Sequence, residues 1–291
     1  MRERTAETLV PTTCDLGEGP HWDAAHARLH WLDIPARVLH TWGLDGRHDS
    51  YALDRPTSFV APTRAGGLVA AGEHQVRLLD ARGGELRVLA TLPAVPGTRT
   101  NDGACDPQGR LWIGTADAEP DRGAGCLYRV DGQGAVELLR TGISMSNGID
   151  WSPDGHIAYH VDTRPGRISR LELDDHGDVT TIDTFVSTEL MPDGLAVDAE
   201  GGVWVAFWDG GSVRRYTPDA VVDEVIHVDG GHITSCAFGG ADGTELFITT
   251  ARQGLSRTEL ARFPQAGALF VVDVGICGRG VNAFEVHDPS A

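Results

Sequence analysis

Four polar residues stand within two positions of a glycine at the start of short apolar stretches. They are Glu18 in LGEGP (16–20), Asn101 in RTNDG (99–103), Asn147 in SNG (146–148) and Asp193 in MPDG (191–194). Two carboxylates with amide oxygens form a hard ligand set that suits a divalent cation and leaves coordination positions open. Taken singly, Asn-Gly and Asp-Gly also indicate simple turns. Turn chemistry does not explain Glu18, and a shared site explains all four segments together.

These residues can meet only if repeated elements place them at equivalent positions. Six segments combine a polar or Gly/Pro turn with a short apolar strand, and they begin at residues 23, 63, 106, 152, 198 and 240. A second short strand follows each of them. A period in the forties with about four strands per unit is typical of a β-propeller blade. We therefore predict an all-β fold, a six-bladed β-propeller that occupies residues 1–291 as a single domain. An open sandwich of similar strands is the alternative.

The propeller would bring the four polar residues together. The innermost strand of each blade begins at the same end of the central channel, so residues at equivalent repeat positions converge on the axis. Glu18, Asn101, Asn147 and Asp193 are therefore expected to face one another. The turns fit this architecture, because Pro-Asp-Gly at 153–155 supplies residues that tolerate tight hairpins.

Composition excludes several classes of partner. The 291 residues carry 24 Lys+Arg against 42 Asp+Glu, a net charge of −18, which argues against nucleic acid and against anionic membranes. The sequence has no apolar signal region and no run long enough to span a bilayer. Five cysteines without a CxxC pair indicate reduced thiols and predict a cytoplasmic protein. Phosphate-loop, GxSxG and HExxH motifs are absent.

The sequence resembles the regucalcin/gluconolactonase family of six-bladed propeller lactonases. The matching stretches keep their order over most of the chain: LGEGPHWD (16–23), RTNDGACDPQGRLWIGT (99–115), SNGIDWSPDG (146–155), YHVDT (159–163), PDGLAVDAEGGVWVAFW (192–208), TSCAFGG (234–240) and ITTAR (248–252). The resemblance implies that Glu18, Asn147 and Asp193 bind one divalent metal ion and that Asp193 also transfers the proton. An oxygen-rich site with few protein ligands accepts calcium, zinc, manganese, magnesium or iron(II).

The resemblance also implies a substrate-binding group. Arg99 and Asn101 would contact the substrate, with Glu119 as a third member, and Asp117 is the alternative to Glu119. Arg99 would offer a charged donor to substrate oxygens and stabilise a developing oxyanion. A surface ion pair between Arg99 and Asp102 is the alternative interpretation of Arg99. Asp102 itself is expected to brace its loop.

The predicted function is a metal-dependent hydrolase of carbohydrate metabolism that opens the lactone ring of a sugar acid. A bound metal would polarise the carbonyl and activate water. The alternatives are a non-enzymatic calcium-binding propeller and a related propeller esterase. Loops 117–124 and 208–211 are expected to set specificity, while the individual lactone and the oligomeric state stay open. A strand within 278–284 is expected to close the ring.

Overall fold

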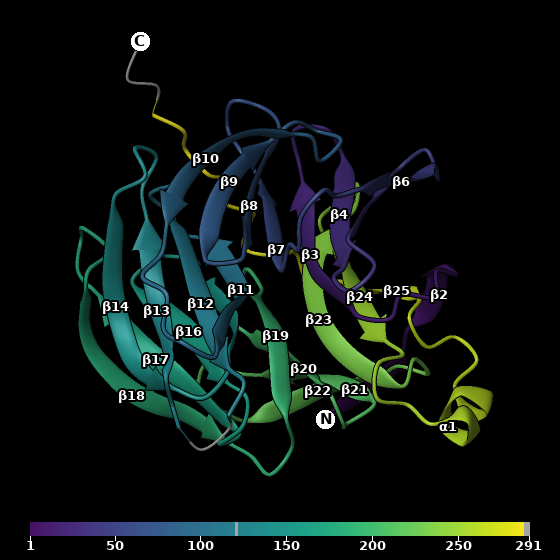
Figure 1. Ribbon diagram of the computed structural model, residues 1–291. Coiled ribbons are helices and arrows are strands. Elements are labelled where there is room, and N and C mark those ends of the chain that lie inside the picture. Colours follow the sequence, from purple (N-terminus) through teal and green to yellow (C-terminus); the bar gives the residue numbers. More distant parts are fainter. Residues whose placement is uncertain (120–121, 288–291) are drawn as a thin grey trace.

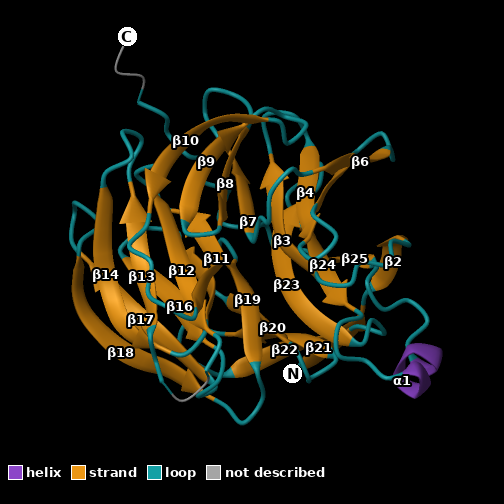
Figure 2. Ribbon diagram, viewed as in Figure 1, coloured by secondary structure: helices purple, strands orange, loops and turns teal. Residues whose placement is uncertain are grey.

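Six twisted antiparallel sheets surround a central channel in the computed structural model, which describes residues 1–119 and 122–287 (Figures 1 and 2). The innermost strands are β3 (Gly17–Asp23), β7 (Phe59–Pro62), β11 (Thr98–Cys105), β15 (Ser146–Trp151), β19 (Pro192–Val197) and β23 (His232–Gly239). The second strands are β4 (Arg28–Asp33), β8 (Leu68–Gly72), β12 (Leu111–Asp117), β16 (Ile157–Asp162), β20 (Val203–Phe207) and β24 (Glu245–Ala251).

The outer half of each blade completes the ring. The third strands are β5 (Val38–Gly43), β9 (Gln75–Leu79), β13 (Gly125–Val130), β17 (Arg167–Leu173), β21 (Ser212–Tyr216) and β25 (Leu269–Asp273). The outermost strands are β6 (His48–Ala52), β10 (Glu85–Thr91), β14 (Val136–Ile143), β18 (Val179–Ser187), β22 (Val222–His227) and β2 (Glu7–Val10). The six-bladed all-β propeller is thus confirmed, and the sequence repeats are the second and third strands of each blade. Blades are numbered 1 to 6 from β3 to β23.

The N-terminus closes the ring. Strand β2 pairs antiparallel with β25 and becomes the outermost strand of blade 6, while β1 (Arg2–Thr5) adds a parallel fifth strand to β22 of blade 5. The prediction that a strand within 278–284 closes the ring is wrong. Residues 277–287, here called the strap, instead cross the ends of several blades, where the amide of Phe284 donates to Pro62 O at 2.9 Å and that of His287 donates to Gly132 O at 3.1 Å.

A repeated aspartate turn explains why the repeats are visible in the sequence. In blade 5, the Asp198 carboxylate accepts from the amide of Gly202 at 2.8 Å and from the indole of Trp204 at 2.8 Å. In blade 3, Asp106 binds the indole of Trp112 at 3.0 Å. Each turn carries one glycine in the left-handed region that a tight hairpin needs. The turn and the following strand are therefore encoded together.

Large apolar side chains fill the space between blades. Trp31, Trp112, Trp151 and Trp204 are fully buried, and Trp112 meets Trp151 edge to face with ring centroids 5.5 Å apart. These tryptophans belong to the core, as the strand pattern predicts. The five cysteines are free thiols, and Cys277 is the exposed one. Within the described ranges, no helix is long and apolar enough to cross a membrane, and α1 (Arg257–Arg262) spans six residues.

Candidate functional site

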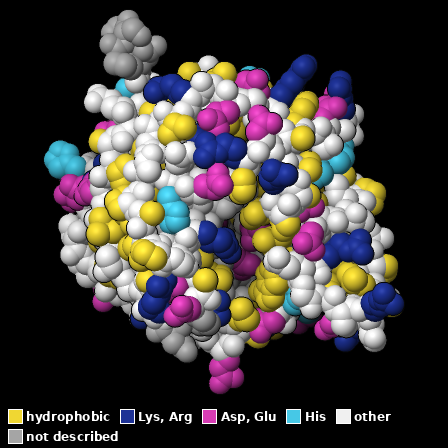
Figure 3. Space-filling view, viewed as in Figure 1, with side chains coloured by type: hydrophobic (Ala, Val, Ile, Leu, Met, Phe, Trp, Pro, Cys, Tyr) yellow, Lys and Arg dark blue, Asp and Glu magenta, His cyan; other side chains and the backbone are white. Residues whose placement is uncertain are grey.

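A cavity of about 270 Å³ lies where the innermost strands begin. We call it the site cavity. Five of the six residues predicted for the site line it: Glu18, Arg99, Asn101, Asn147 and Asp193. They come from four different blades, so the convergence predicted from the repeats is present in the fold. The space-filling view has a depression near its centre in which acidic and basic side chains meet between hydrophobic ones (Figure 3).

Four of these residues, all except Arg99, lie at a β-bulge. The pairing of the innermost strand with its neighbour shifts register between Glu18 and His21, between Ser146 and Ile149, and between Pro192 and Leu195, and the same happens in β11. A bulge breaks the alternation of side chains and can aim a residue into the channel. Glycine is needed here because a Cβ on Gly148 would lie 2.4 Å from the amide nitrogen of Leu195. The glycines beside the site residues are therefore part of its construction.

Two buried oxygens in the cavity have no hydrogen-bond donor among the described residues. They are Asn147 Oδ1 and Asp193 Oδ1, on side chains whose residues are 5% and 4% exposed. The amide nitrogen Nδ2 of Asn147 donates to Thr163 Oγ1 at 3.0 Å, which fixes the amide with its oxygen unpaired. An unpaired buried acceptor costs on the order of 1–3 kcal/mol. The residues present therefore fit a bound cation, which would satisfy both oxygens.

Three carboxyl groups share this part of the channel and disturb one another. Burial, and then the charge of Asp102, raise the pKa of Glu18 to about 8. Burial raises the pKa of Asp102 to about 6. Burial, followed by the charges of Glu18 and Asp102, raises the pKa of Asp193 well above its ordinary value. Such crowding of acids is unfavourable without a positive charge between them, and it is typical of a functional site.

Arg99 and Asn101 lie together at the mouth of the cavity. Arg99 is exposed, and its guanidinium donates to Asn101 Oδ1 at 2.6 Å and to the carbonyl of Thr100 at 3.1 Å. Asn101 Nδ2 donates to the carbonyl of Ser146 at 2.8 Å, which ties blade 3 to blade 4. Arg99 forms no ion pair with Asp102 or any other residue in the described part of the chain. The guanidinium therefore keeps donors available for a substrate.

Glu119 is not among the residues that line the site cavity. Its side chain is exposed, and its backbone amide donates to Asp117 Oδ1 at 3.0 Å. Asp117, the alternative, is buried and bound by Arg122 at 2.8 Å, which lowers the pKa of its carboxyl. Residues 120 and 121 of the predicted specificity loop 117–124 lie outside the described residues. In the other predicted loop, Trp208 lines the cavity and stacks on His232 with ring centroids 4.3 Å apart.

Sequence reasoning missed several residues of the cavity. Asp102 was expected only to brace its loop, and its carboxylate does accept from the amide of Gly103 at 2.8 Å, but it also lines the cavity beside Glu18. The bulge between Thr100 and Gly103 explains how neighbouring residues reach the same channel. The other missed residues are Leu16, Ile34, Ser58, Met145, Thr163, Met191 and Gln253. Thr163 ends the YHVDT motif, so that motif was the available signal.

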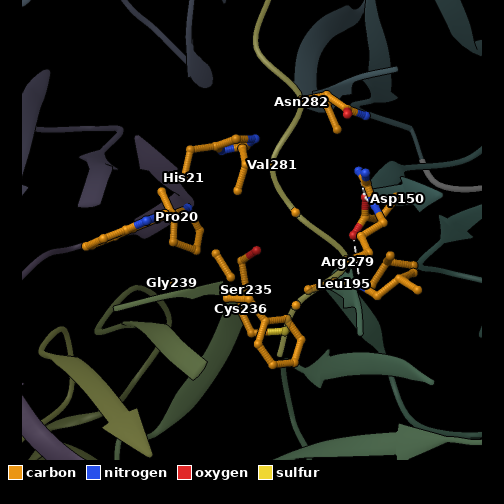
Figure 4. Close-up of a pocket in the computed structure, with 18 of the residues that line it drawn as sticks. Pro20, His21, Asp150, Leu195, Ser235, Cys236, Gly239, Arg279, Val281 and Asn282 are labelled. Atoms are coloured by element: carbon orange, nitrogen blue, oxygen red, sulfur yellow. Dashed lines mark hydrogen bonds and ion pairs between the residues drawn. The ribbon is translucent and has the colours of Figure 1, made fainter. Parts of the chain in front are cut away.

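A second cavity of about 400 Å³ lies at the other end of the innermost strands, covered by the strap (Figure 4). We call it the floor cavity. Arg279 of the strap pairs with Asp150 there through its Nε at 2.7 Å, so these two charges neutralise each other. Asp102 lines both cavities. The floor cavity is larger, but the unpaired oxygens of Asn147 and Asp193 face the site cavity, which is therefore the candidate active site.

Comparisons with known proteins find relatives over nearly the whole chain. The family description SMP-30/Gluconolactonase/LRE-like region matches residues 16–252. The chain is 32% identical over 285 residues to regucalcin from Oryctolagus cuniculus, covering 94% of this chain and 95% of the relative. It is 35% identical over 280 residues to 6-deoxy-6-sulfogluconolactonase from Pseudomonas putida, covering 94% of this chain and 96% of the relative.

Solved structures match over the same extent. The crystal structure of a calcium-binding protein, regucalcin, from Agrobacterium tumefaciens has a TM-score of 0.90 and 34% identity, and the match covers 99% of both chains. A gluconolactonase from Xanthomonas campestris has a TM-score of 0.72 and 23% identity, covering 93% of this chain and 88% of the other. At that identity the second match shows a shared fold alone.

Proposed function

The chain belongs to the SMP-30/gluconolactonase/LRE-like family, and on that premise we propose that it is a divalent-metal-dependent hydrolase that opens the lactone ring of a sugar acid. The pair of unpaired buried oxygens on Asn147 and Asp193 carries the proposal. Glu18 would complete the set of protein ligands. Within residues 1–119 and 122–287, no cluster of three His, Cys, Asp or Glu side chains with metal-binding geometry occurs, so the proposed ligand set includes the amide oxygen of Asn147.

The chemistry follows from what each side chain offers. A cation held by Glu18, Asn147 and Asp193 would act as a Lewis acid on the lactone carbonyl and lower the pKa of water beside it. Asp193 would accept a proton from the water that adds to the acyl carbon and deliver it to the ring oxygen as the acyl C–O bond breaks. Arg99 would donate to the carbonyl oxygen as negative charge develops there. Asn101 Oδ1, at the cavity mouth, would accept from a sugar hydroxyl.

The cavity also constrains the substrate. A volume of about 270 Å³ is below the usual range for drug-sized ligands and suits a single sugar ring. Leu16, Met145 and Met191 add apolar surface beside the polar side chains of the site cavity, which favours a compact lactone over an extended chain. A substrate contact by Glu119 stays a prediction, and so does the cytoplasmic location expected from the unpaired cysteines.

The test is a lactonase assay on a panel of sugar-acid lactones. Chelator-treated protein should lose all hydrolysis above the spontaneous rate and regain it with calcium, zinc, manganese, magnesium or iron(II). Asp193→Asn should reduce kcat/KM at least 100-fold, while Asp174→Asn, on an exposed outer turn, should leave it unchanged. Hydrolysis that survives both chelation and Asp193→Asn would rule out the metal mechanism.

Two other outcomes would identify the alternative functions. Tight calcium binding without turnover of any lactone would favour a calcium-binding propeller, the property that the Agrobacterium relative is described by. Turnover of aryl esters in place of lactones would favour a propeller esterase.

A further inference from the structure

The strands that carry Glu18, Asn147 and Asp193 share a contact just before each of these residues. The backbone amide of the residue two positions earlier donates to an aspartate carboxylate from the end of the second strand of the same blade, or just beyond it. The N–Oδ1 distances are 3.3 Å from Leu16 to Asp33, 3.1 Å from Met145 to Asp162 and 3.0 Å from Met191 to Asp209.

The carbonyl groups of the same three residues are also held. They accept from the backbone amides next to the three aspartates, with N–O distances of 3.1 Å from Ile34 to Leu16, 3.1 Å from Thr163 to Met145 and 3.0 Å from Trp208 to Met191. Each residue is therefore fixed at its amide and at its carbonyl. We call this pair of contacts the clasp.

The clasp is confined to the blades that carry the proposed metal ligands, within the part of the chain that the structure describes. In blade 3, Arg99 stands two residues before Asn101, but it pairs with Ala116 in the β11–β12 ladder. The counterpart aspartate there, Asp117, binds Arg122 instead. In blade 2 the second strand ends at Gly72, and the carboxylate of Glu73 just beyond it binds Arg55 instead. In blade 6 the second strand ends at Ala251, and Arg252 and Gln253 follow it without a carboxylate. A device needed only to end a blade strand would occur in the other blades as well.

The clasp acts on the wall of the site cavity. Leu16, Met145 and Met191 all line it. Asp162 is 2% exposed, and its Oδ1 also accepts from the amide and hydroxyl of Ser144. Its hydrogen bonds therefore go to the segment that leads into Asn147, and it has one longer contact with Arg167. Burying a carboxylate is costly unless hydrogen bonds compensate it, and here the compensation comes from backbone at the site.

We propose that Asp33, Asp162 and Asp209 are positioning residues that hold the three metal-binding strands in register for one divalent cation. The inference rests on the proposed function, because it concerns the same metal. Ligands from three separate blades must converge within about 0.5 Å to bind a cation well, and partners of this outer kind typically contribute 10- to 100-fold to metal affinity.

Asp209 offers the cleanest test. It is exposed, and the amide of Met191 is its hydrogen-bond partner, so its removal should not unfold the protein. Asp174 provides a matched control, because its carboxylate also accepts backbone amides, from His176 and Asp178 at 2.9 Å, but on an outer turn away from the site.

The experiment measures metal dissociation constants by calorimetry, with calcium and manganese each titrated alone into chelator-treated protein. Asp209→Ala should weaken binding roughly 10- to 100-fold. Asp209→Asn, which keeps an acceptor oxygen, should remain within about threefold of the wild type, and Asp174→Ala should not change it. Asp33→Ala, in a different blade, should repeat the loss, and urea unfolding of each metal-free variant verifies the fold.

The outcomes separate this inference from the proposed function. Wild-type protein that binds neither metal would overturn the metal site itself and the inference with it. Wild-type protein that binds metal, together with Asp209→Ala and Asp33→Ala that bind it equally well, would overturn the inference and leave the proposed function intact. If Asp209→Asn binds metal as weakly as Asp209→Ala, the inference is also contradicted, since it depends on the acceptor oxygen that Asp209→Asn retains.

Discussion

At the scale of single residues, the site is distinguished by buried oxygen atoms that have no hydrogen-bond partner in the described part of the chain. Asn147 gives its amide nitrogen to Thr163, so its oxygen is left free in a buried place. Asp193 has one free oxygen beside it, and Glu18 shares the same channel. In an ordinary core these groups would be paired or replaced by apolar side chains. The unpaired oxygens of Asn147 and Asp193 support the proposed site for a positive charge.

Replacing the threonine that orients Asn147 tests this interpretation. Thr163→Val keeps the shape but removes the acceptor for Asn147 Nδ2, so the amide can rotate and its oxygen is no longer fixed. We expect metal affinity to fall by roughly 10-fold, measured by calorimetry. Thr180→Val in the same blade removes an exposed hydroxyl that donates to Glu172 O and should leave the affinity unchanged. Equal affinity in both variants would contradict the role of Thr163.

The crowded acids predict how stability depends on pH. Between its ordinary pKa and about 8, Glu18 keeps a proton in the folded protein that the unfolded chain releases, so stability falls as pH rises through this range. Four histidines whose pKa values are lowered by burial, His21, His40, His48 and His160, act in the opposite direction until the unfolded chain no longer protonates them, at about pH 7.5. Comparison with Glu18→Gln isolates the carboxyl effect, because the histidine contribution is the same in both proteins.

Between pH 6.5 and 8, the chelator-treated wild type should lose about 1–2 kcal/mol of unfolding free energy relative to chelator-treated Glu18→Gln, whose amide does not titrate. Urea denaturation of both proteins at the two pH values measures this difference. Saturating calcium should reduce it, since a bound cation displaces the proton. A metal-free wild type that loses no more stability than Glu18→Gln over this range would show that the pKa of Glu18 is not raised.

At the scale of elements, the same few devices recur in different blades. The aspartate turn before the second strand accounts for the sequence repeats, because Asp198, its glycine and Trp204 must keep a fixed spacing to meet. The β-bulges recur at the innermost strands, and they decide which side chains enter the channel. Repeated devices of this kind are what a single sequence can reveal.

The sequence predicts the fold and most of the site for that reason, and the remainder escapes it for identifiable causes. Glu18, Asn101, Asn147 and Asp193 converge as expected because they occupy one repeat position. Asp102 was not predicted because regular strand alternation would place its side chain on the opposite face from Asn101. The bulge breaks that alternation, so both residues line the site cavity.

The aspartate turn of blade 5 should be a large source of stability. Asp198 is fully buried and binds Arg215 Nε at 2.7 Å as well as Trp204. Asp198→Ala would leave a buried guanidinium without that partner, so we expect a loss of about 3–5 kcal/mol in unfolding free energy. Urea denaturation measures it, with Asp174→Ala as the matched exposed turn, expected to cost about 1 kcal/mol. Similar losses in the two variants would contradict this role of the buried turn.

At the scale of the whole molecule, the two chain ends perform different tasks. Strand β2 closes the ring, and β1 extends across to blade 5. The strap crosses the opposite end of the channel from the site and contacts blades 2, 3, 4 and 5 as well as blade 6. It occurs once, follows no repeat and has no regular strand pattern, so the sequence could not reveal its course.

The strap should stabilise the ring without contributing to the chemistry. Phe284 is fully buried between blades 2 and 3, in the same cluster as Phe59 and Leu111. Phe284→Ala should lower the unfolding free energy by about 3–5 kcal/mol through the cavity it creates. Val281, on the same segment but 41% exposed, provides the control, and Val281→Ala should cost less than about 1 kcal/mol.

Calcium affinity tests whether the strap, at one end of the channel, affects the site cavity at the other end. Asp102, on the innermost strand β11, lines both the site cavity and the floor cavity. A change in the strap would therefore reach the site through the innermost strands. Because the clasps fix those strands from the site side, we expect Phe284→Ala, measured below its unfolding temperature, to bind calcium with the affinity of the wild type. A large loss of calcium affinity in this variant, with the fold intact by circular dichroism, would show that the strap and the site are coupled through the channel.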